Sequence, residues 1–214
     1  MPVAIAHGVA FALACALLVW AARSLPWYKL RGDSEALRVL LFATAALAAM
    51  RWFNADAVQG VKLHFIGATV ATLMFGARFA LWAMAVASLA AGAMGSVWYG
   101  WAPDFLVCGA SGVLVSQAIV RYIERRLPPN LLIYVWVRGF LGGALAIAAS
   151  HLLKAGVAAW QDDPATAAYL AAALPMMFGE GFFCGAAITL IVVYRPAWCA
   201  TFDDARYLPP RSPE

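Results

Sequence analysis

Charged residues are scarce in this chain. Only 12% of its 214 residues are charged, whereas 64% are hydrophobic, and the mean hydropathy is +0.79. Soluble domains contain about 25% charged and about 45–50% apolar residues. A chain with so few charges cannot cover its apolar surface in water, which excludes a soluble globular protein. The apolar runs are also continuous rather than alternating with polar residues, which excludes a membrane β-barrel. The remaining class is a helical membrane protein.

Sequence motifs for catalysis and for nucleotide binding are also missing. The four cysteines form no CxxC pair, and the chain has no HExxH sequence, phosphate-binding loop, nucleophile elbow or dinucleotide fingerprint. These absences argue against an enzyme, and any ATP-driven function would need a separate ATPase. The net charge of +4 is typical of Lys and Arg retained on the cytoplasmic side of a membrane, so it does not indicate a nucleic-acid partner.

The apolar runs predict an all-α, polytopic membrane helix bundle. A spanning helix needs about 20 mostly apolar residues. Seven transmembrane helices are expected, over residues 3–22, 36–53, 63–76, 79–95, 105–120, 131–153 and 165–194. Gly76-Ala77-Arg78 predicts a tight turn between the third and the fourth, and Pro175 is expected to kink the last run or to mark a turn. Residues 1–214 are predicted to form a single integral membrane domain, with a short polar cytoplasmic tail from about residue 195.

The distribution of basic residues predicts the orientation in the membrane. With the N-terminus outside, the three basic residues of the outer segments are Arg51, Lys62 and Lys154. The eleven of the inner segments are Arg23, Lys29, Arg31, Arg38, Arg78, Arg121, Arg125, Arg126, Arg195, Arg206 and Arg211. Because Lys and Arg concentrate in cytoplasmic loops, we expect an outer N-terminus and a cytoplasmic C-terminus. The expected location is a bacterial inner membrane, crossed several times.

This topology places all three histidines toward the outer side. His7, His64 and His151 fall there, and four further polar residues lie at the same level: Asn54, Asp56, Asp104 and Cys108. Imidazoles with nearby carboxylate or amide groups suit a divalent first-row metal such as nickel, cobalt or zinc. The alternative interpretation is that these histidines simply sit among lipid headgroups.

Arg138 and Glu180 are charges deep within apolar runs. An unpaired charge at such a depth is costly, so each is expected to face the bundle interior or a cavity. Since the sixth and seventh predicted helices are antiparallel, the two side chains lie at similar depth. A salt bridge between them is the expected arrangement, and a substrate or proton relay is the alternative.

Three stretches combine small residues with single polar groups. The first is Gly60-Val61-Lys62-Leu63-His64-Phe65-Ile66-Gly67-Ala68, the second is Gly109-Ala110-Ser111-Gly112, and the third runs from Glu180-Gly181 through Thr189 to Arg195-Pro196. Together with seven helices and an outer N-terminus, they make most of the chain resemble a known family. It is similar to the membrane-embedded substrate-binding subunits of cobalt- and nickel-type energy-coupling factor transporters.

The resemblance implies a function. A subunit of this family captures a divalent cation, cobalt or nickel, from outside and works in the lipid membrane with a transmembrane coupling subunit and paired ATPase subunits. The metal is then the substrate, and no tightly bound cofactor is expected. His64 matches the family's metal-binding His.

The chain departs from the family's pattern at its start. The family's chains begin Met-His, and the terminal amine and that His supply most of the nitrogen ligands. This chain begins Met1-Pro2, and proline has no amide proton to lose. His7 is therefore the second candidate ligand.

Two alternatives to a metal carrier remain open. One is a related subunit that takes a small organic molecule, held by Trp98, Tyr99 and Trp101, with Asn54, Asp56, Trp98 and Asp104 as candidate residues of the substrate loops. The other is a membrane scaffold or assembly protein that has kept the fold and lost the metal site.

Overall fold

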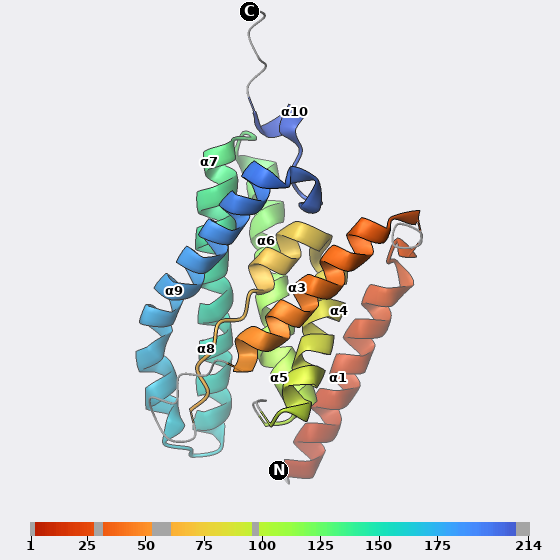
Figure 1. Ribbon diagram of the computed structural model, residues 1–214. Helices are drawn as coiled ribbons and strands as arrows, with labels where there is room; N and C mark the ends of the chain where they lie inside the picture. Colours follow the sequence, from red (N-terminus) through yellow and green to blue (C-terminus); the bar gives the residue numbers. More distant parts are fainter. Residues whose placement is uncertain (1–2, 28–31, 53–60, 96–98, 209–214) are drawn as a thin grey trace, which may run out of the picture.

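A computed structural model describes residues 3–27, 32–52, 61–95 and 99–208, and these residues form a helical bundle (Figure 1). The elements are α1 (Val3–Arg23), α3 (Ser34–Trp52), α4 (Ala68–Ala93), α5 (Trp101–Asp104), the π-helical η1 (Phe105–Ala110), α6 (Ser111–Arg126), α7 (Leu131–Ile133), the π-helical η2 (Tyr134–Leu141), α8 (Gly142–Trp160), α9 (Ala165–Tyr194), the 3-10 turn η3 (Pro196–Trp198) and α10 (Asp204–Tyr207). The segments from α5 to α6 and from α7 to α8 are each one continuous helical run.

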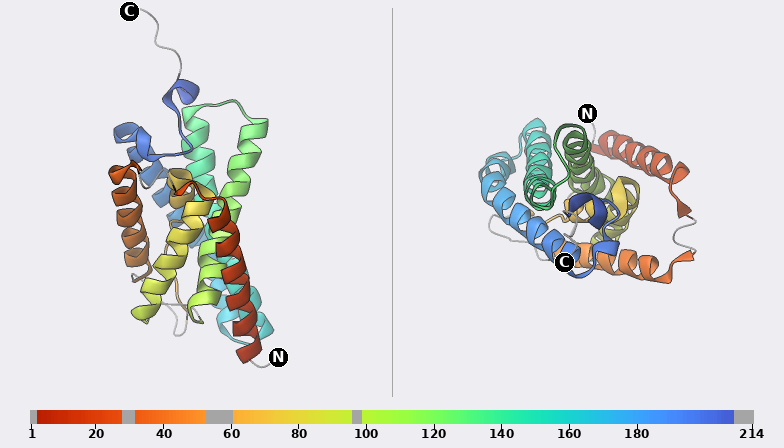
Figure 2. Two further views of the ribbon diagram at one scale, coloured as in Figure 1. Left: turned by 90° about the vertical axis from the view of Figure 1, so that its right-hand side faces the viewer. Right: turned by 90° about the horizontal axis from the view of Figure 1, so that it is seen from above.

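α4 consists of two helices joined at Gly76. The backbone of this residue is non-helical, with φ 76° and ψ 158°, and the chain turns there (Figures 1 and 2). This backbone conformation is open essentially only to glycine. With α4 divided in this way, the described residues hold seven helical segments, of which the first half of α4 is short. The predicted all-helical class and the number of helices are confirmed, and the predicted turn is found at Gly76. That all seven helices cross the membrane stays a prediction.

The segment from Val61 to Ile66 is extended rather than helical, so the prediction of a helix starting at Leu63 is wrong. The physical reason lies at the start of α4. Gly67 takes a left-handed φ of 67°, and the backbone N–H groups of Ile66 and Gly67 donate to the carboxylate of Glu180 on α9, at 2.9 and 2.7 Å. A carboxylate that accepts from backbone amides at a helix start satisfies donors that no helical turn can satisfy.

Five helices among the described residues are long and apolar enough to cross a membrane. They are Ile5–Arg23, Ala68–Ala93, Trp101–Arg126, Leu131–Trp160 and Ala165–Tyr194. α3 carries three charged side chains and does not reach the same hydropathy. α9 continues without interruption through Pro175. The chain is thus a multi-pass membrane protein.

Small residues allow helices α8 and α9 to approach closely. A Cβ atom on Gly143 would lie 2.8 Å from Cβ of Cys184, and one on Gly181 would lie 2.9 Å from the carbonyl oxygen of Phe140. Gly112 plays the same part on α6, where an added Cβ would meet the Cβ of Ala68 at 2.8 Å. This is the packing of membrane helices through small residues that the glycine-containing stretches suggest.

The chain after α9 packs back on the bundle as far as residue 208. α10 lies over the middle of the bundle in the view from above (Figure 2). The amide of Ala200 donates to the carbonyl of Met74 at 2.8 Å, and the hydroxyl of Thr201 donates to that of Leu73, also at 2.8 Å. These bonds satisfy carbonyl groups at the end of the first half of α4, just before the turn at Gly76.

Candidate metal site

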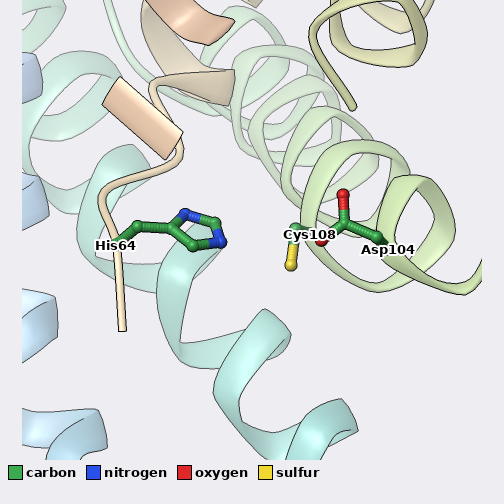
Figure 3. A group of neighbouring side chains, drawn as sticks. All are labelled: His64, Asp104 and Cys108. Carbon is green, nitrogen blue, oxygen red and sulfur yellow. The ribbon is translucent and has the colours of Figure 1, made fainter. Parts of the chain in front are cut away.

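Three potential metal ligands meet inside the bundle. One ligand atom each from His64, Asp104 and Cys108 lies within 4.8 Å of the others, and all three side chains are buried (Figure 3). His64 comes from the extended segment, whereas Asp104 and Cys108 come from one helical run. An imidazole, a carboxylate and a thiol form a mixed nitrogen, oxygen and sulfur donor set. Such a set suits first-row divalent metals better than it suits Mg²⁺ or Ca²⁺, which prefer oxygen ligands alone.

The two helical ligands are four residues apart. Asp104 ends α5, and Cys108 lies in η1, the π-helical turn that follows. Residues at this spacing project from the same side of a helix, and Figure 3 shows both side chains on the side that faces His64. Widened π-helical turns occur frequently at functional sites because they shift side chains out of the regular register.

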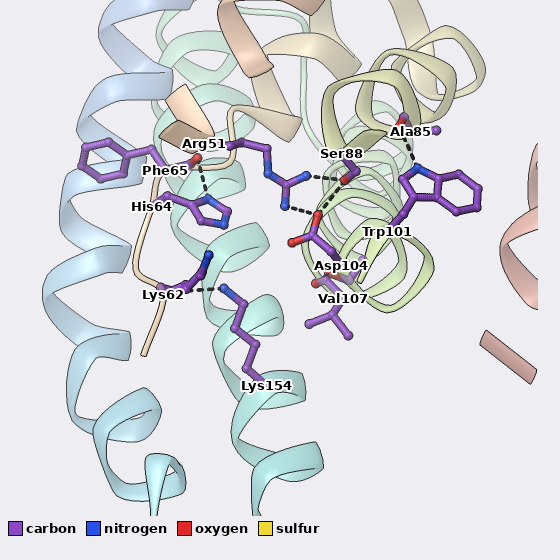
Figure 4. A network of polar contacts seen from close by, with 11 residues as sticks. Arg51, Lys62, His64, Phe65, Ala85, Ser88, Trp101, Asp104, Val107 and Lys154 are labelled. Carbon is purple, nitrogen blue, oxygen red and sulfur yellow. Dashed lines mark hydrogen bonds and ion pairs between the residues drawn. The ribbon is translucent and has the colours of Figure 1, made fainter. Parts of the chain in front are cut away.

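His64 is held by an unusual backbone segment. Its side chain is 3% exposed, and Nδ1 lies 3.1 Å from the carbonyl oxygen of Phe65. Nε2 is buried and has no hydrogen-bond partner among the described residues. The backbone amides of Ile66 and Gly67, two and three residues after His64, donate hydrogen bonds to the carboxylate of Glu180. The two hydrogen bonds to Glu180 therefore fix the chain that carries His64. The imidazole is directed toward the helical run that carries Asp104 (Figure 4).

A buried cation accompanies the donor group. Arg51, at the end of α3, places Nη2 2.7 Å from Oδ2 of Asp104, and both side chains are 0% exposed (Figure 4). The guanidinium also donates to Oγ of Ser88, and Ser88 in turn donates to the same Oδ2 at 2.7 Å. Ser88 comes from α4, so the triangle of Arg51, Ser88 and Asp104 joins three helical segments.

A second buried cation, Lys154 on α8, lies on the other side of His64 (Figure 4). Its Nζ donates to the carbonyl oxygen of Lys62 at 3.2 Å and lies 5.6 Å from the centre of the Tyr169 ring. A carbonyl oxygen and an aromatic face are neutral partners that stabilise an ammonium group. Two buried cations, Arg51 and Lys154, therefore lie beside the three donors, one of which, Asp104, is acidic.

The structure brings together only part of the predicted site. His64, Asp104 and Cys108 converge, whereas His7 is exposed on α1 and does not belong to the donor group. His151 is buried on α8, where its ring packs against Tyr169 with centroids 6.3 Å apart. The other predicted residues, Asn54, Asp56 and Trp98, lie outside the described residues.

The expected salt bridge between Arg138 and Glu180 is corrected by the structure. Glu180 accepts from two backbone amides and from the thiol of Cys184 at 3.5 Å. Nη1 of Arg138 instead lies 3.4 Å from Oε1 of Glu124, and its guanidinium lies 5.5 Å from each of the ring centres of Tyr134 and Tyr207. A similar predicted depth in the membrane does not show that two charges are paired, because backbone amides and aromatic rings can also stabilise a buried charge.

Sequence reasoning missed the part played by Arg51. It stands at the end of an apolar run and was assigned to an outer segment, where a basic residue is solvated. The sequence feature that indicates this role is Asp104, an acidic residue just before a later apolar run, at the same predicted level in the membrane as Arg51. Two opposite charges at the same predicted level could have been paired, but nothing in the sequence shows that α3 lies beside that run.

The fold and the donor group define a multi-pass helical membrane protein with a buried group of side chains that could hold a metal ion. The chain belongs to the CbiM family: the family model described as "Cobalt uptake substrate-specific transmembrane region" matches residues 3–198. No curated protein and no solved structure matches the chain. The protein is thus a substrate-specific transmembrane component of a cobalt uptake system and not a member of a catalytic family. The family resemblance predicted from the sequence is confirmed.

Proposed function

We propose that this chain captures a single Co²⁺ or Ni²⁺ ion with His64, Asp104 and Cys108, as the substrate-binding subunit of an energy-coupling factor importer. The observation that supports this proposal most strongly is the convergence of three different donor types within 4.8 Å of one another in a buried place. Family membership supplies the substrate class, since the matched family takes up cobalt.

The donor set consists of an imidazole, a carboxylate and a thiolate. His64 supplies the nitrogen ligand from the extended segment, and Asp104 and Cys108 supply an oxygen and a sulfur ligand from the run beginning at Trp101. Two anionic ligands offset part of the positive charge of a divalent ion and of the neighbouring Arg51 and Lys154, which reduces the cost of burying the ion.

The same proposal includes the orientation and the partners. We infer an outer N-terminus, a cytoplasmic C-terminus and a bacterial inner membrane from the bias of eleven inner to three outer basic residues. A coupling subunit and ATPase subunits would then move the loaded subunit, since this chain has no nucleotide-binding motif of its own.

Direct binding measurements test the proposed site. The full chain is purified without a His-tag and equilibrated with Co²⁺, and bound metal per chain is counted. We expect about one ion per chain in the parent protein. We expect a loss of at least about tenfold in affinity for His64→Ala and for Cys108→Ser, because each removes one inner ligand.

Matched controls separate ligands from other histidines and cysteines. His151→Ala removes a buried imidazole outside the donor group, His7→Ala removes the other predicted histidine, and Cys15→Ser removes a cysteine of α1. All three are expected to bind Co²⁺ like the parent. Equal losses in His64→Ala and His151→Ala, or no stoichiometric binding by the parent chain, would contradict the proposed site.

A further inference from the structure

The buried ion pair of Arg51 and Asp104 has a consequence for metal binding. Arg51 is a fully buried cation whose carboxylate partner, 2.7 Å away, is also one of the three candidate metal ligands. A buried charge is stable only when it is paired and hydrogen-bonded. In the metal-free protein, the guanidinium therefore supplies the positive charge that Asp104 needs.

An incoming metal ion would meet this cation at the carboxylate. Co²⁺ at the donor group would gain the charge of Asp104, and it would be repelled by the guanidinium a few ångströms away. Coulomb interactions at such separations are several times stronger in a protein interior than in water. Binding is therefore a competition between a built-in monovalent cation and an external divalent one for the same carboxylate.

We propose that Arg51 is a positioning and specificity-determining residue that competes with the substrate ion for Asp104. This inference rests on the proposed function of the donor group. When the metal binds, the carboxylate of Asp104 coordinates the ion in place of its ion pair with Arg51. The guanidinium keeps its hydrogen bond to Oγ of Ser88. When the metal leaves, Arg51 again neutralises Asp104, so the empty site does not hold an unpaired buried carboxylate.

The competition explains how the site selects its ion. A cation that offers Asp104 only a charge gains little by displacing a guanidinium already 2.7 Å away. A transition-metal ion gains bonds to the imidazole of His64 and the thiolate of Cys108 at the same time. Every ion that binds must therefore offset the free energy lost when the Arg51–Asp104 pair is broken. Only ions that also bind nitrogen and sulfur ligands gain enough free energy to do so.

Charge removal at position 51 tests the inference. The full-length Arg51→Gln protein, purified in detergent, is titrated with Co²⁺ alone and compared with the parent chain. Without the competing cation we expect Co²⁺ to bind at least about tenfold more tightly. A Gln variant that binds Co²⁺ as weakly as the parent, or more weakly, would overturn the inference, because that result means that Arg51 only supports the fold or orients Asp104.

Two further variants keep the test decisive. Arg51→Lys retains the charge but cannot hold Ser88 and Asp104 with one planar group, so its affinity is expected to lie between those of the parent and of the Gln variant. If Arg51→Gln fails to fold, the Lys variant decides: tighter binding than in the parent supports competition, and equal or weaker binding overturns it. Arg38→Gln, on the exposed face of the same helix, is the matched control and should leave the affinity unchanged.

The outcomes also separate this inference from the proposed function. A parent chain that binds no Co²⁺ defeats the proposed function. A parent chain that binds about one Co²⁺, lost in His64→Ala, together with unchanged binding in Arg51→Gln, leaves the metal site standing and defeats only the competition.

Discussion

At the scale of single residues, three buried charges have partners that differ in kind. Arg51 has a carboxylate, Glu180 has two backbone amides, and Lys154 has a carbonyl oxygen and an aromatic ring. All three kinds of partner stabilise a charge that is buried inside the bundle. Only the first leaves a ligand atom shared with the donor group. Glu180 has instead a structural part, because it holds the chain that positions His64.

The role of Glu180 predicts the effect of removing its charge. Glu180→Gln keeps the size of the side chain but offers one acceptor oxygen and a competing NH₂ group to the amides of Ile66 and Gly67. The free energy of unfolding is expected to fall by about 2–3 kcal/mol, because charge-assisted hydrogen bonds to backbone amides are lost. Chemical unfolding in detergent measures this change.

The double variant distinguishes this account from a salt bridge to Arg138. Since Arg138 has Glu124 and two tyrosine rings as partners, Arg138→Met should not rescue Glu180→Gln, and the two changes should add. Recovery of stability in the double variant would mean that the two charges interact directly.

At the scale of elements, the site depends on the extended segment before α4, which carries His64, and on the turn at Gly76 that follows it. An extended segment followed by a short helix brings backbone to the middle of the bundle, and the turn at Gly76 sends the chain back. Irregular backbone within a membrane protein is tolerated where it is buried in protein and its polar groups are satisfied. Glu180 does this at one end of the short helix, and Ala200 and Thr201 do it at the other.

Glycine at position 76 is therefore expected to be required. With φ 76° and ψ 158°, the residue has a conformation that other L-amino acids reach only with strain. Gly76→Ala should destabilise the protein by about 1–3 kcal/mol, although an added Cβ has open space around it. The cost would thus be one of backbone conformation alone, measured by thermal or chemical unfolding.

Gly156 gives the matched control. It lies in regular helix on α8, and an added Cβ there also has open space. Gly156→Ala should leave stability unchanged or raise it by up to about 1 kcal/mol, because alanine favours the helix. Equal effects of the two substitutions would show that the conformation at Gly76 is not strained for alanine.

The sequence predicts the elements better than it predicts their contacts. Continuous apolar runs and the Gly76 turn predict the number of helices, but the third predicted helix begins five residues too early, at Leu63 instead of Ala68. The extended segment at His64 was missed, because Leu63, Phe65 and Ile66 are as apolar as any helical stretch, and the reason for the break lies on α9 more than 100 residues away. The convergence of His64 with Asp104 and Cys108 depends on that break, so it could be expected only as a shared level in the membrane.

At the scale of the whole molecule, orientation decides from which side the site is filled. The basic residues predict an outer N-terminus and a cytoplasmic C-terminus. A tag with a protease cleavage site at the N-terminus should then be cleaved when the protease is added to intact spheroplasts. The same tag at the C-terminus should be cleaved only after the membrane is opened. The reverse pattern, or both ends on one face, would contradict the assignment of the donor group to the outer side.

The central claim is that His64, Asp104 and Cys108 bind the transported metal together. X-ray absorption at the cobalt edge of the loaded protein tests it most directly, because it identifies the ligand atoms. The account predicts one sulfur ligand at about 2.3 Å, a usual metal–thiolate distance, with nitrogen and oxygen ligands beside it. The sulfur signal should vanish in Cys108→Ser and persist in Cys15→Ser. A ligand shell made only of nitrogen and oxygen in the parent protein would contradict the account.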